Sequence, residues 1–120
     1  MKVNSLYVTA RDFERAKACY TDHIFQREHD SETDRFVFWD IDGFLFGIFN
    51  PNAIDVEVDF GDSTVPTIEV EDAAAAHVRL TKAGLESVME PHDVNDTHVA
   101  QIRDTEGNVL EFYHWLKKAE

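Results

Sequence analysis

The sequence predicts an α+β domain of two tandem βαβββ units, which form a curved, partly closed sheet around a cleft with the helices outside. The main support is an internal repeat, because an extended run enters a helix at an aspartate twice, at Asp12 and at Asp72. In each half a second aspartate, Asp40 or Asp104, follows at a similar separation and leads through a glycine turn into a short apolar strand. Because 120 residues with 43% hydrophobic side chains suffice for one core, we expect a single domain over residues 1–120. Its expected parts are a first unit at about 1–50, a linker at 51–62 and a second unit at 63–118.

The first unit begins with a strand and continues into an amphipathic helix. Apolar side chains recur at spacings of three and four after Asp12, which places them on one helix face. The carboxylate of Asp12 suits a helix start, where it meets unpaired amides and the positive end of the helix dipole. Asp42-Gly43 is a strong signal for a tight hairpin turn. The expected elements are a strand at 3–9, a helix at 12–23 and strands at about 25–31, 35–40 and 44–50.

The second unit repeats this order of elements. Gly84 is well placed to end its helix in the left-handed conformation. The linker is strongly acidic but alternates apolar with charged side chains, so we interpret it as a loop that can add an edge strand. The expected elements are a strand at 64–70, a helix at 72–83 and strands at about 86–91, 97–103 and 109–115.

Composition excludes several classes of function. The formal net charge of -13 repels the phosphates of nucleic acids and anionic lipid headgroups, so neither is an expected partner. The acidic excess serves either solubility or the attraction of a cationic small molecule, and net charge does not choose between them. Cys19 is the only cysteine, which excludes an intramolecular disulfide and favours a reducing, cytoplasmic location. The sequence shows neither an export signal nor a run of apolar residues long enough to span a membrane.

Strand alternation predicts which side chains face the helices and which face the cleft. The helix side is expected to hold an apolar core, listed here by its strand residues: Phe36, Phe38, Phe46, Ile48, Ala100, Ile102, Leu110 and Phe112. The opposite face mixes aromatic and apolar side chains with a few polar groups, which is typical of a small-molecule pocket. The alternative is that these aromatic side chains only pack the units, or two subunits, together. The predicted ligand-binding residues are Tyr7, Val37, Trp39, Phe49, Thr67, Gln101, Arg103, Glu111 and Tyr113.

Two segments of the chain match motifs of a known family. Residues 12–20 have the sequence DFERAKACY, which is similar to the pattern D-x-E-x-A-x-x-F-Y, and residues 103–112 have the sequence RDTEGNVLEF, which is similar to R-D-P-x-G-N-x-x-E-F. These patterns resemble the opening helix and the closing signature of the glyoxalase, bleomycin-resistance and extradiol dioxygenase (vicinal oxygen chelate) superfamily. The chain departs from the pattern at Cys19, where the helix usually has Phe, and at Phe25, where Gly often follows the helix. The second departure indicates a different bend into the next strand.

The resemblance implies four positions for the ligands of one divalent metal, which polarises a substrate oxygen as a Lewis acid. In this sequence those positions hold Ser5, Gly47, Val65 and Glu111, of which only Glu111 can bind a metal. The six histidines supply no replacement pattern. We therefore expect no cofactor, and a divalent metal at an atypical site is the alternative.

Glu111 is the best candidate for a catalytic residue on this face. Its carboxylate is either structural, bonded to Gln101, Arg103 or Tyr7, or it accepts a cationic or hydroxyl group of a ligand or acts as a base. The favoured function is metal-independent binding of a small molecule in an aromatic cleft around Glu111, as in the bleomycin-resistance-type members. The alternatives are a glyoxalase-like lyase, isomerase or dioxygenase with an atypical metal site, and a non-catalytic interaction module. The resemblance also implies a homodimer.

Overall fold

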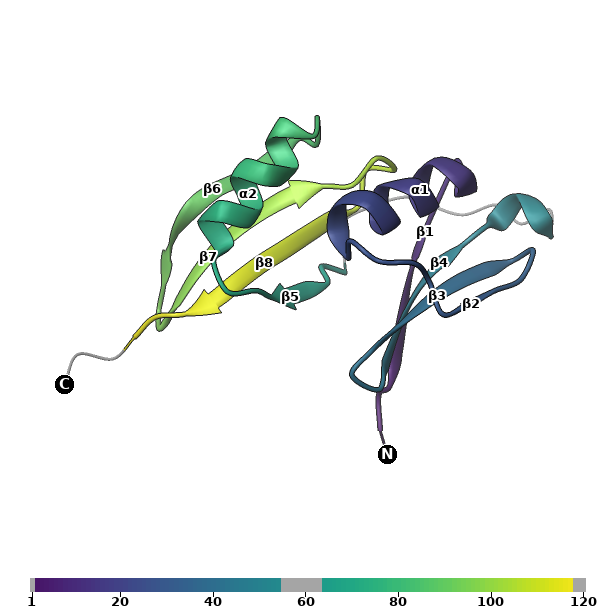
Figure 1. Ribbon diagram of the computed structural model, residues 1–120, viewed down its shortest axis with the longest axis horizontal. Helices are drawn as coiled ribbons and strands as arrows, with labels where there is room; N and C mark the ends of the chain where they lie inside the picture. Colours follow the sequence, from purple (N-terminus) through teal and green to yellow (C-terminus); the bar gives the residue numbers. More distant parts are fainter. Residues whose placement is uncertain (1, 55–63, 118–120) are drawn as a thin grey trace. The chain divides into compact units, whose positions relative to one another are not determined.

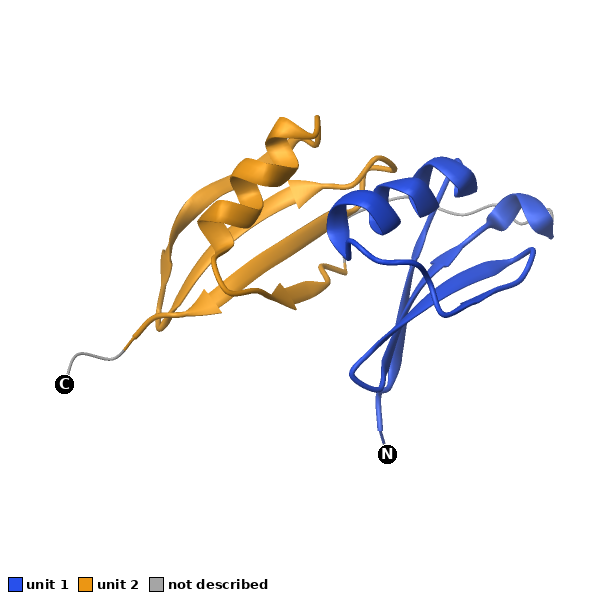
Figure 2. Cartoon of the chain, viewed as in Figure 1, with its two compact units in different colours: residues 1–60 blue, residues 61–120 orange. Residues whose placement is uncertain are grey.

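The computed structural model describes residues 2–54 and 64–117 and divides the chain into two compact units, residues 1–60 and 61–120 (Figure 2). Each unit contains a helix and an open, four-stranded mixed sheet, which confirms the predicted α+β class and the tandem units (Figure 1). Most of the predicted linker, 55–62, lies outside the described residues, including the part that could add an edge strand. Within the described ranges, no helix has the length and apolar character that crossing a membrane requires.

Unit 1 has the strand order β1-β4-β3-β2, in which β1 runs parallel to β4 and the other pairs are antiparallel. The Asp12 side chain accepts from the backbone N–H of Arg15 at 3.0 Å, which confirms it as the cap of the first helix. Asp42 and Gly43 have φ angles of 52° and 90°, as a two-residue hairpin turn requires. The elements are β1 (Ser5–Thr9), α1 (Phe13–Cys19), the π-helical turn η1 (Tyr20–Ile24), β2 (Ser31–Glu32), β3 (Phe36–Ile41), β4 (Phe44–Phe49) and the 3₁₀ turn η2 (Pro51–Ala53).

The strand predicted at 25–31 is wrong, because only its last residue lies in a strand. Gln26 has a φ of 57°, which breaks the extended conformation directly after η1. Side chains then attach the segment to β3: the indole N–H of Trp39 donates to the Arg27 carbonyl at 3.0 Å, and Asp30 accepts from the Asp40 backbone N–H at 2.7 Å. The Asp40 amide, followed by the guanidinium of Arg27, holds the pKa of Asp30 below its ordinary value. Side-chain bonds thus replace most of the predicted ladder.

Unit 2 has the corresponding strand order, β5-β8-β7-β6, with β5 parallel to β8. The strands predicted at 97–103 and 109–115 are confirmed at the same residues. The first strand of the unit is shorter than the predicted 64–70. The second, predicted at 86–91, runs on past its predicted end and has two register shifts against its neighbour. The elements are β5 (Thr67–Glu69), α2 (Ala73–Lys82), β6 (Ser87–Val94), β7 (Thr97–Arg103) and β8 (Val109–Trp115).

The core of unit 2 lies between α2 and the sheet. Leu110 and Phe112 on β8 are almost fully buried, as are Ala100 and Ile102 on β7, so the predicted core residues of these strands are confirmed. Leu80 of α2 is fully buried as well. Burying each of the large apolar side chains contributes about 1.5 to 3 kcal/mol to the free energy of folding, so this layer holds the helix on the sheet.

We expect Gly84→Ala to lower the free energy of unfolding by about 1 kcal/mol. Gly84 ends α2 with a φ of 100°, and the next amide, of Leu85, donates to the carbonyl of Leu80 at 3.1 Å. An added Cβ meets no atom within 4 Å, so the cost comes from the backbone alone. Urea unfolding measures it, with Gly84→Asn as the control, because Asn tolerates this conformation better. An alanine variant as stable as the parent chain contradicts the assignment.

Candidate functional site

The face of the unit 2 sheet that points away from α2, here called the outer face of unit 2, carries the polar residues that the sequence singles out. Residues in register on neighbouring strands point to the same side of a sheet. Glu111 on β8 is in register with Thr67 on β5 and with Gln101 on β7, so these three form one row. Tyr113 is in register with Glu69 and Val99 and forms the next row. The predicted face is therefore confirmed for Thr67, Gln101, Arg103, Glu111 and Tyr113, and their role in binding stays a prediction.

Glu111 and Gln101 form the polar centre of this face. Gln101 Nε2 donates to Glu111 Oε1 at 3.0 Å, and both side chains are half-buried. The sequence analysis named Gln101, Arg103 and Tyr7 as possible hydrogen-bond partners of Glu111, and in the structure the partner is Gln101. Arg103 turns elsewhere: its Nη1 donates to the Gly107 carbonyl at 2.9 Å, and its Nε lies 3.6 Å from Glu86 Oε2. Among the described residues, the second oxygen of Glu111 and the amide oxygen of Gln101 have no hydrogen-bond partner, so both can accept from a ligand.

Tyr113 and Glu69 form a second polar pair one row along. Tyr113 Oη donates to Glu69 Oε1 at 3.2 Å. Loss of solvation raises the pKa of Tyr113, and the hydrogen bond and negative charge of Glu69 raise it further. The Trp115 ring lies edge-on to Tyr113 with centroids 5.9 Å apart, and Trp115 is 61% exposed. Glu69 is absent from the predicted site residues, although it lies two positions after Thr67 and so shares its face.

The predicted face is wrong for Val37 and Trp39. Both are 0% exposed. Trp39 is in register with Phe46 and packs near Tyr20 of η1 with ring centroids 6.0 Å apart, so it belongs to the core on the helix side. Residues 36–39 are all apolar, and alternation therefore gives no sign of which residues face the helix.

Phe36 and Phe38 were predicted to lie in the core, but they alternate with Val37 and Trp39 along β3 and therefore lie on the opposite side of the sheet. That side, which points away from α1, is here called the outer face of unit 1. Phe36 lies 5.4 Å from Tyr7, 5.1 Å from Phe49 and 5.3 Å from Phe38 between ring centroids. Tyr7 is 55% exposed. Tyr7 and Phe49 therefore lie on the predicted face, within an aromatic cluster in place of the polar row of unit 2.

The four positions that a family metal would use do not fit one. In unit 1 they hold a serine, Ser5, and a glycine, Gly47, whose backbone is covered by the ring of Phe38. A side chain at Gly47 would require the ring of Phe38 to move, because an added Cβ would overlap that ring. In unit 2 the positions hold Val65 and Glu111. Glu111 is therefore the only one of the four residues whose side chain can bind a metal ion. Within residues 2–54 and 64–117, no group of three or more His, Cys, Asp or Glu side chains could hold a metal ion.

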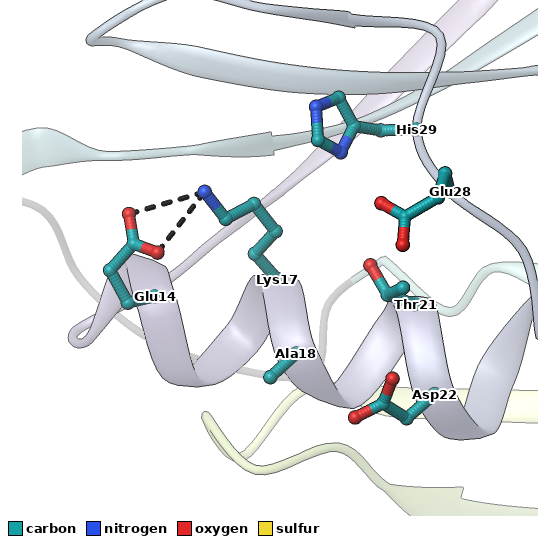
Figure 3. A pocket seen from close by; sticks show the side chains of 7 residues that line it. All are labelled: Glu14, Lys17, Ala18, Thr21, Asp22, Glu28 and His29. Carbon is teal, nitrogen blue, oxygen red and sulfur yellow. Dashed lines mark hydrogen bonds and ion pairs between the residues drawn. The ribbon is translucent and has the colours of Figure 1, made fainter.

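A pocket of about 300 Å³ lies on the helix side of unit 1 (Figure 3). It has a polar wall in which the ammonium of Lys17 is held by Glu14 at 3.1 Å and by Glu32 at 3.1 Å. Burial alone lowers the pKa of Lys17, but its bonds and attraction to these carboxylates outweigh burial and raise it. The sequence analysis did not predict this pocket, which is separated from the outer face of unit 1 by the sheet. Its lining residues are Glu14, Lys17, Ala18, Thr21, Asp22, Glu28 and His29.

Comparison with known proteins identifies the family. A model of the Glyoxalase/Bleomycin resistance protein/Dioxygenase superfamily matches residues 2–112, so the chain belongs to this superfamily. The search of curated proteins found no match. The structure is similar to a glyoxalase/bleomycin resistance protein/dioxygenase family enzyme from Burkholderia phytofirmans PsJN, with a TM-score of 0.82 and 16% identity over 97% of this chain and 100% of that one.

Two further solved structures share the fold. Lactoylglutathione lyase from Agrobacterium tumefaciens has a TM-score of 0.74 and 19% identity over 94% of this chain and 92% of its own. A protein described as a conserved domain protein has a TM-score of 0.78 and 23% identity over 96% of this chain and 99% of its own. At these identities the likeness concerns the fold alone.

We expect the two tryptophans to differ in their access to solvent. Trp115→Phe leaves Trp39 as the only tryptophan, and its burial predicts blue-shifted emission that acrylamide quenches weakly. Trp39→Phe leaves the exposed Trp115, whose emission acrylamide quenches strongly. If acrylamide quenches both variants equally while circular dichroism shows that both are folded, the placement of Trp39 in the core is contradicted.

We expect Glu69→Gln to move the ionisation of Tyr113 to lower pH, because the carboxylate helps to keep the phenol protonated. A raised pKa in the folded state stabilises the fold below the unfolded value of about 10, and this contribution is lost as pH rises through the folded pKa. Tyrosinate absorbance measures the titration, with the curve of Tyr113→Phe subtracted. Glu90→Gln is the control, because its side chain is 81% exposed and approaches His77 of α2. If the pKa of Tyr113 is unchanged in Glu69→Gln, the hydrogen bond between Tyr113 and Glu69 is contradicted.

Proposed function

We propose that the outer face of unit 2 binds a small organic molecule without the help of a metal, as a member of the bleomycin-resistance type. One observation carries the proposal: the half-buried pair of Gln101 and Glu111 leaves two hydrogen-bond acceptors unused beside Tyr113. Neither oxygen is among the buried side-chain atoms that lack a partner, so both can be reached from solvent by a ligand that donates to them.

The donor chemistry of the chain favours binding over the metal chemistry that other superfamily members use. Glu111 occupies a position that the family resemblance implies for a metal ligand, but it stands with Ser5, Gly47 and Val65 at the other three. The ring of Phe38 covers Gly47, so a metal ligand at position 47 would also require that ring to move. Glu111 is therefore proposed to act as a direct acceptor for the ligand.

We also propose that the protein is a cytoplasmic homodimer. The outer face of unit 1 supports this, because Tyr7 and Leu45 are exposed there beside the aromatic cluster, and a second copy can cover such a surface.

The binding proposal is tested by calorimetric titration with 1-naphthalenemethanol, a neutral aromatic alcohol, in buffer containing EDTA. We expect binding to be unchanged by EDTA and weakened about tenfold by Glu111→Ala, because a hydrogen bond to a charged group contributes about 1.5 to 3 kcal/mol. Glu90→Gln is the matched control and should bind as the parent chain does. Loss of binding in EDTA, or equal binding by Glu111→Ala, overturns the proposal.

The dimer is tested by equilibrium sedimentation at micromolar concentration. We expect twice the chain mass of 13.8 kDa for the parent protein and the chain mass for Tyr7→Glu combined with Leu45→Glu. A parent protein that sediments as a 13.8 kDa species refutes the dimer.

A further inference from the structure

The outer face of unit 2 carries negative charge at two neighbouring positions. Glu111 lies on β8 in register with Thr67 of β5, and Glu69 lies two residues further along β5. Glu69 is therefore a diagonal neighbour of Glu111, with its carboxylate bonded to Tyr113. The positive charge of Arg103, on the same face, does not offset these carboxylates, because its guanidinium is bound to the Gly107 carbonyl and lies near Glu86 at the end of β7. The charge that faces a ligand between these positions is negative.

The hydrogen bonds on this face use donors and leave acceptors available. The hydroxyl of Tyr113 donates to Glu69, and one of the two N–H groups of Gln101 Nε2 donates to Glu111. Each carboxylate keeps its second oxygen for another donor, since the described residues place no partner on either one. A ligand that offers N–H donors and positive charge therefore matches the face, whereas an anion meets two carboxylates.

Aromatic side chains border the same charges. Trp115 follows Tyr113 on the same side of β8, and the two rings meet edge to face. Such rings attract organic cations through their π faces as well as their apolar area.

We infer that the ligand of the outer face of unit 2 is an organic ammonium ion with an aromatic body, and that Glu69 sets the preference for positive charge. This rests on the proposed function, since it names the class of ligand for the same face. The ammonium donates to Glu69 and Glu111, and the aromatic body lies against Tyr113 and Trp115. Glu69 thereby becomes a specificity-determining residue for which the sequence analysis assigned no role.

The test is a series of three probes with one ring system and different charge: 1-naphthylmethylammonium, 1-naphthalenemethanol and 1-naphthoate. Calorimetric titration at neutral pH, low salt and with EDTA compares their affinities. We expect the ammonium to bind about tenfold more tightly than the alcohol, because attraction between its charge and the two carboxylates adds to the hydrogen bond that the alcohol also makes. The naphthoate should bind most weakly, because the same carboxylates repel it. Added salt should weaken only the ammonium, since screening acts on the charge.

Glu69→Gln removes the negative charge but keeps a side chain of nearly the same size with an oxygen that accepts a hydrogen bond, so it tests the effect of charge alone. We expect it to weaken binding of the ammonium by up to about fivefold and to leave binding of the alcohol unchanged, because Glu69 is exposed and one exposed charge contributes at most about 1 kcal/mol. Glu90→Gln removes an equal charge from the same unit on the side of α2 and should leave both affinities unchanged.

The outcomes distinguish this inference from the proposed function. If the alcohol binds but the ammonium binds no better, or if Glu69→Gln keeps the full preference for the ammonium, the inference is overturned and the proposed binding face stands. If none of the three probes binds to the folded protein, both are overturned.

Discussion

Each unit of this protein follows from one constraint: a four-stranded sheet with a single helix can bury only one of its two faces against that helix. In unit 2 the helix α2 covers Ala100, Ile102, Leu110 and Phe112, and the sequence supplies apolar side chains at every one of these alternate positions. The residues between them point to the outer face, and because α2 does not cover that face they can be polar. The chemistry of the protein can therefore change on the outer face while the fold stays constant.

The two units use that freedom differently at matching places in their sheets. In unit 2 the central pair of β7 and β8 is Gln101 with Glu111, a hydrogen-bonded polar pair. In unit 1 the central pair of β3 and β4 is Phe38 with Gly47, in which an aromatic ring occupies the space that a side chain would need. One backbone arrangement thus carries a polar centre in one unit and an aromatic cluster in the other. Of the four residues at the positions that the family resemblance implies for metal ligands, only Glu111 has a side chain that can bind a metal ion.

The sequence predicted most of the backbone and the sheet face of most of the site residues, for reasons that particular residues show. The repeat, the Asp12 cap, the Asp42-Gly43 turn and the two last strands depend on local signals, and all are confirmed. The segment 25–31 failed because its conformation depends on distant partners, such as the bond from the Trp39 indole to the Arg27 carbonyl. Glu69 could have been found, since its distance of two residues from Thr67 places both on one face.

The site residues show the limit of strand alternation most clearly. Alternation assigned β7 and β8 correctly, because the polar residues Gln101, Arg103 and Glu111 interrupt the apolar ones and mark the outer face. It failed in β3, where four apolar residues follow one another. Only the register with β4 shows that Trp39 joins Phe46 and Tyr20 in the core.

The central claim, that the outer face of unit 2 binds a small molecule without a metal, is tested most directly by nuclear magnetic resonance. Amide shifts of isotopically labelled protein are recorded in EDTA while 1-naphthylmethylammonium is added. The account predicts saturating shifts that concentrate at Thr67, Gln101, Glu111 and Tyr113, with α2 little affected. Shifts confined to the pocket that Lys17 and His29 line in unit 1, or no saturating shifts at all, would contradict it.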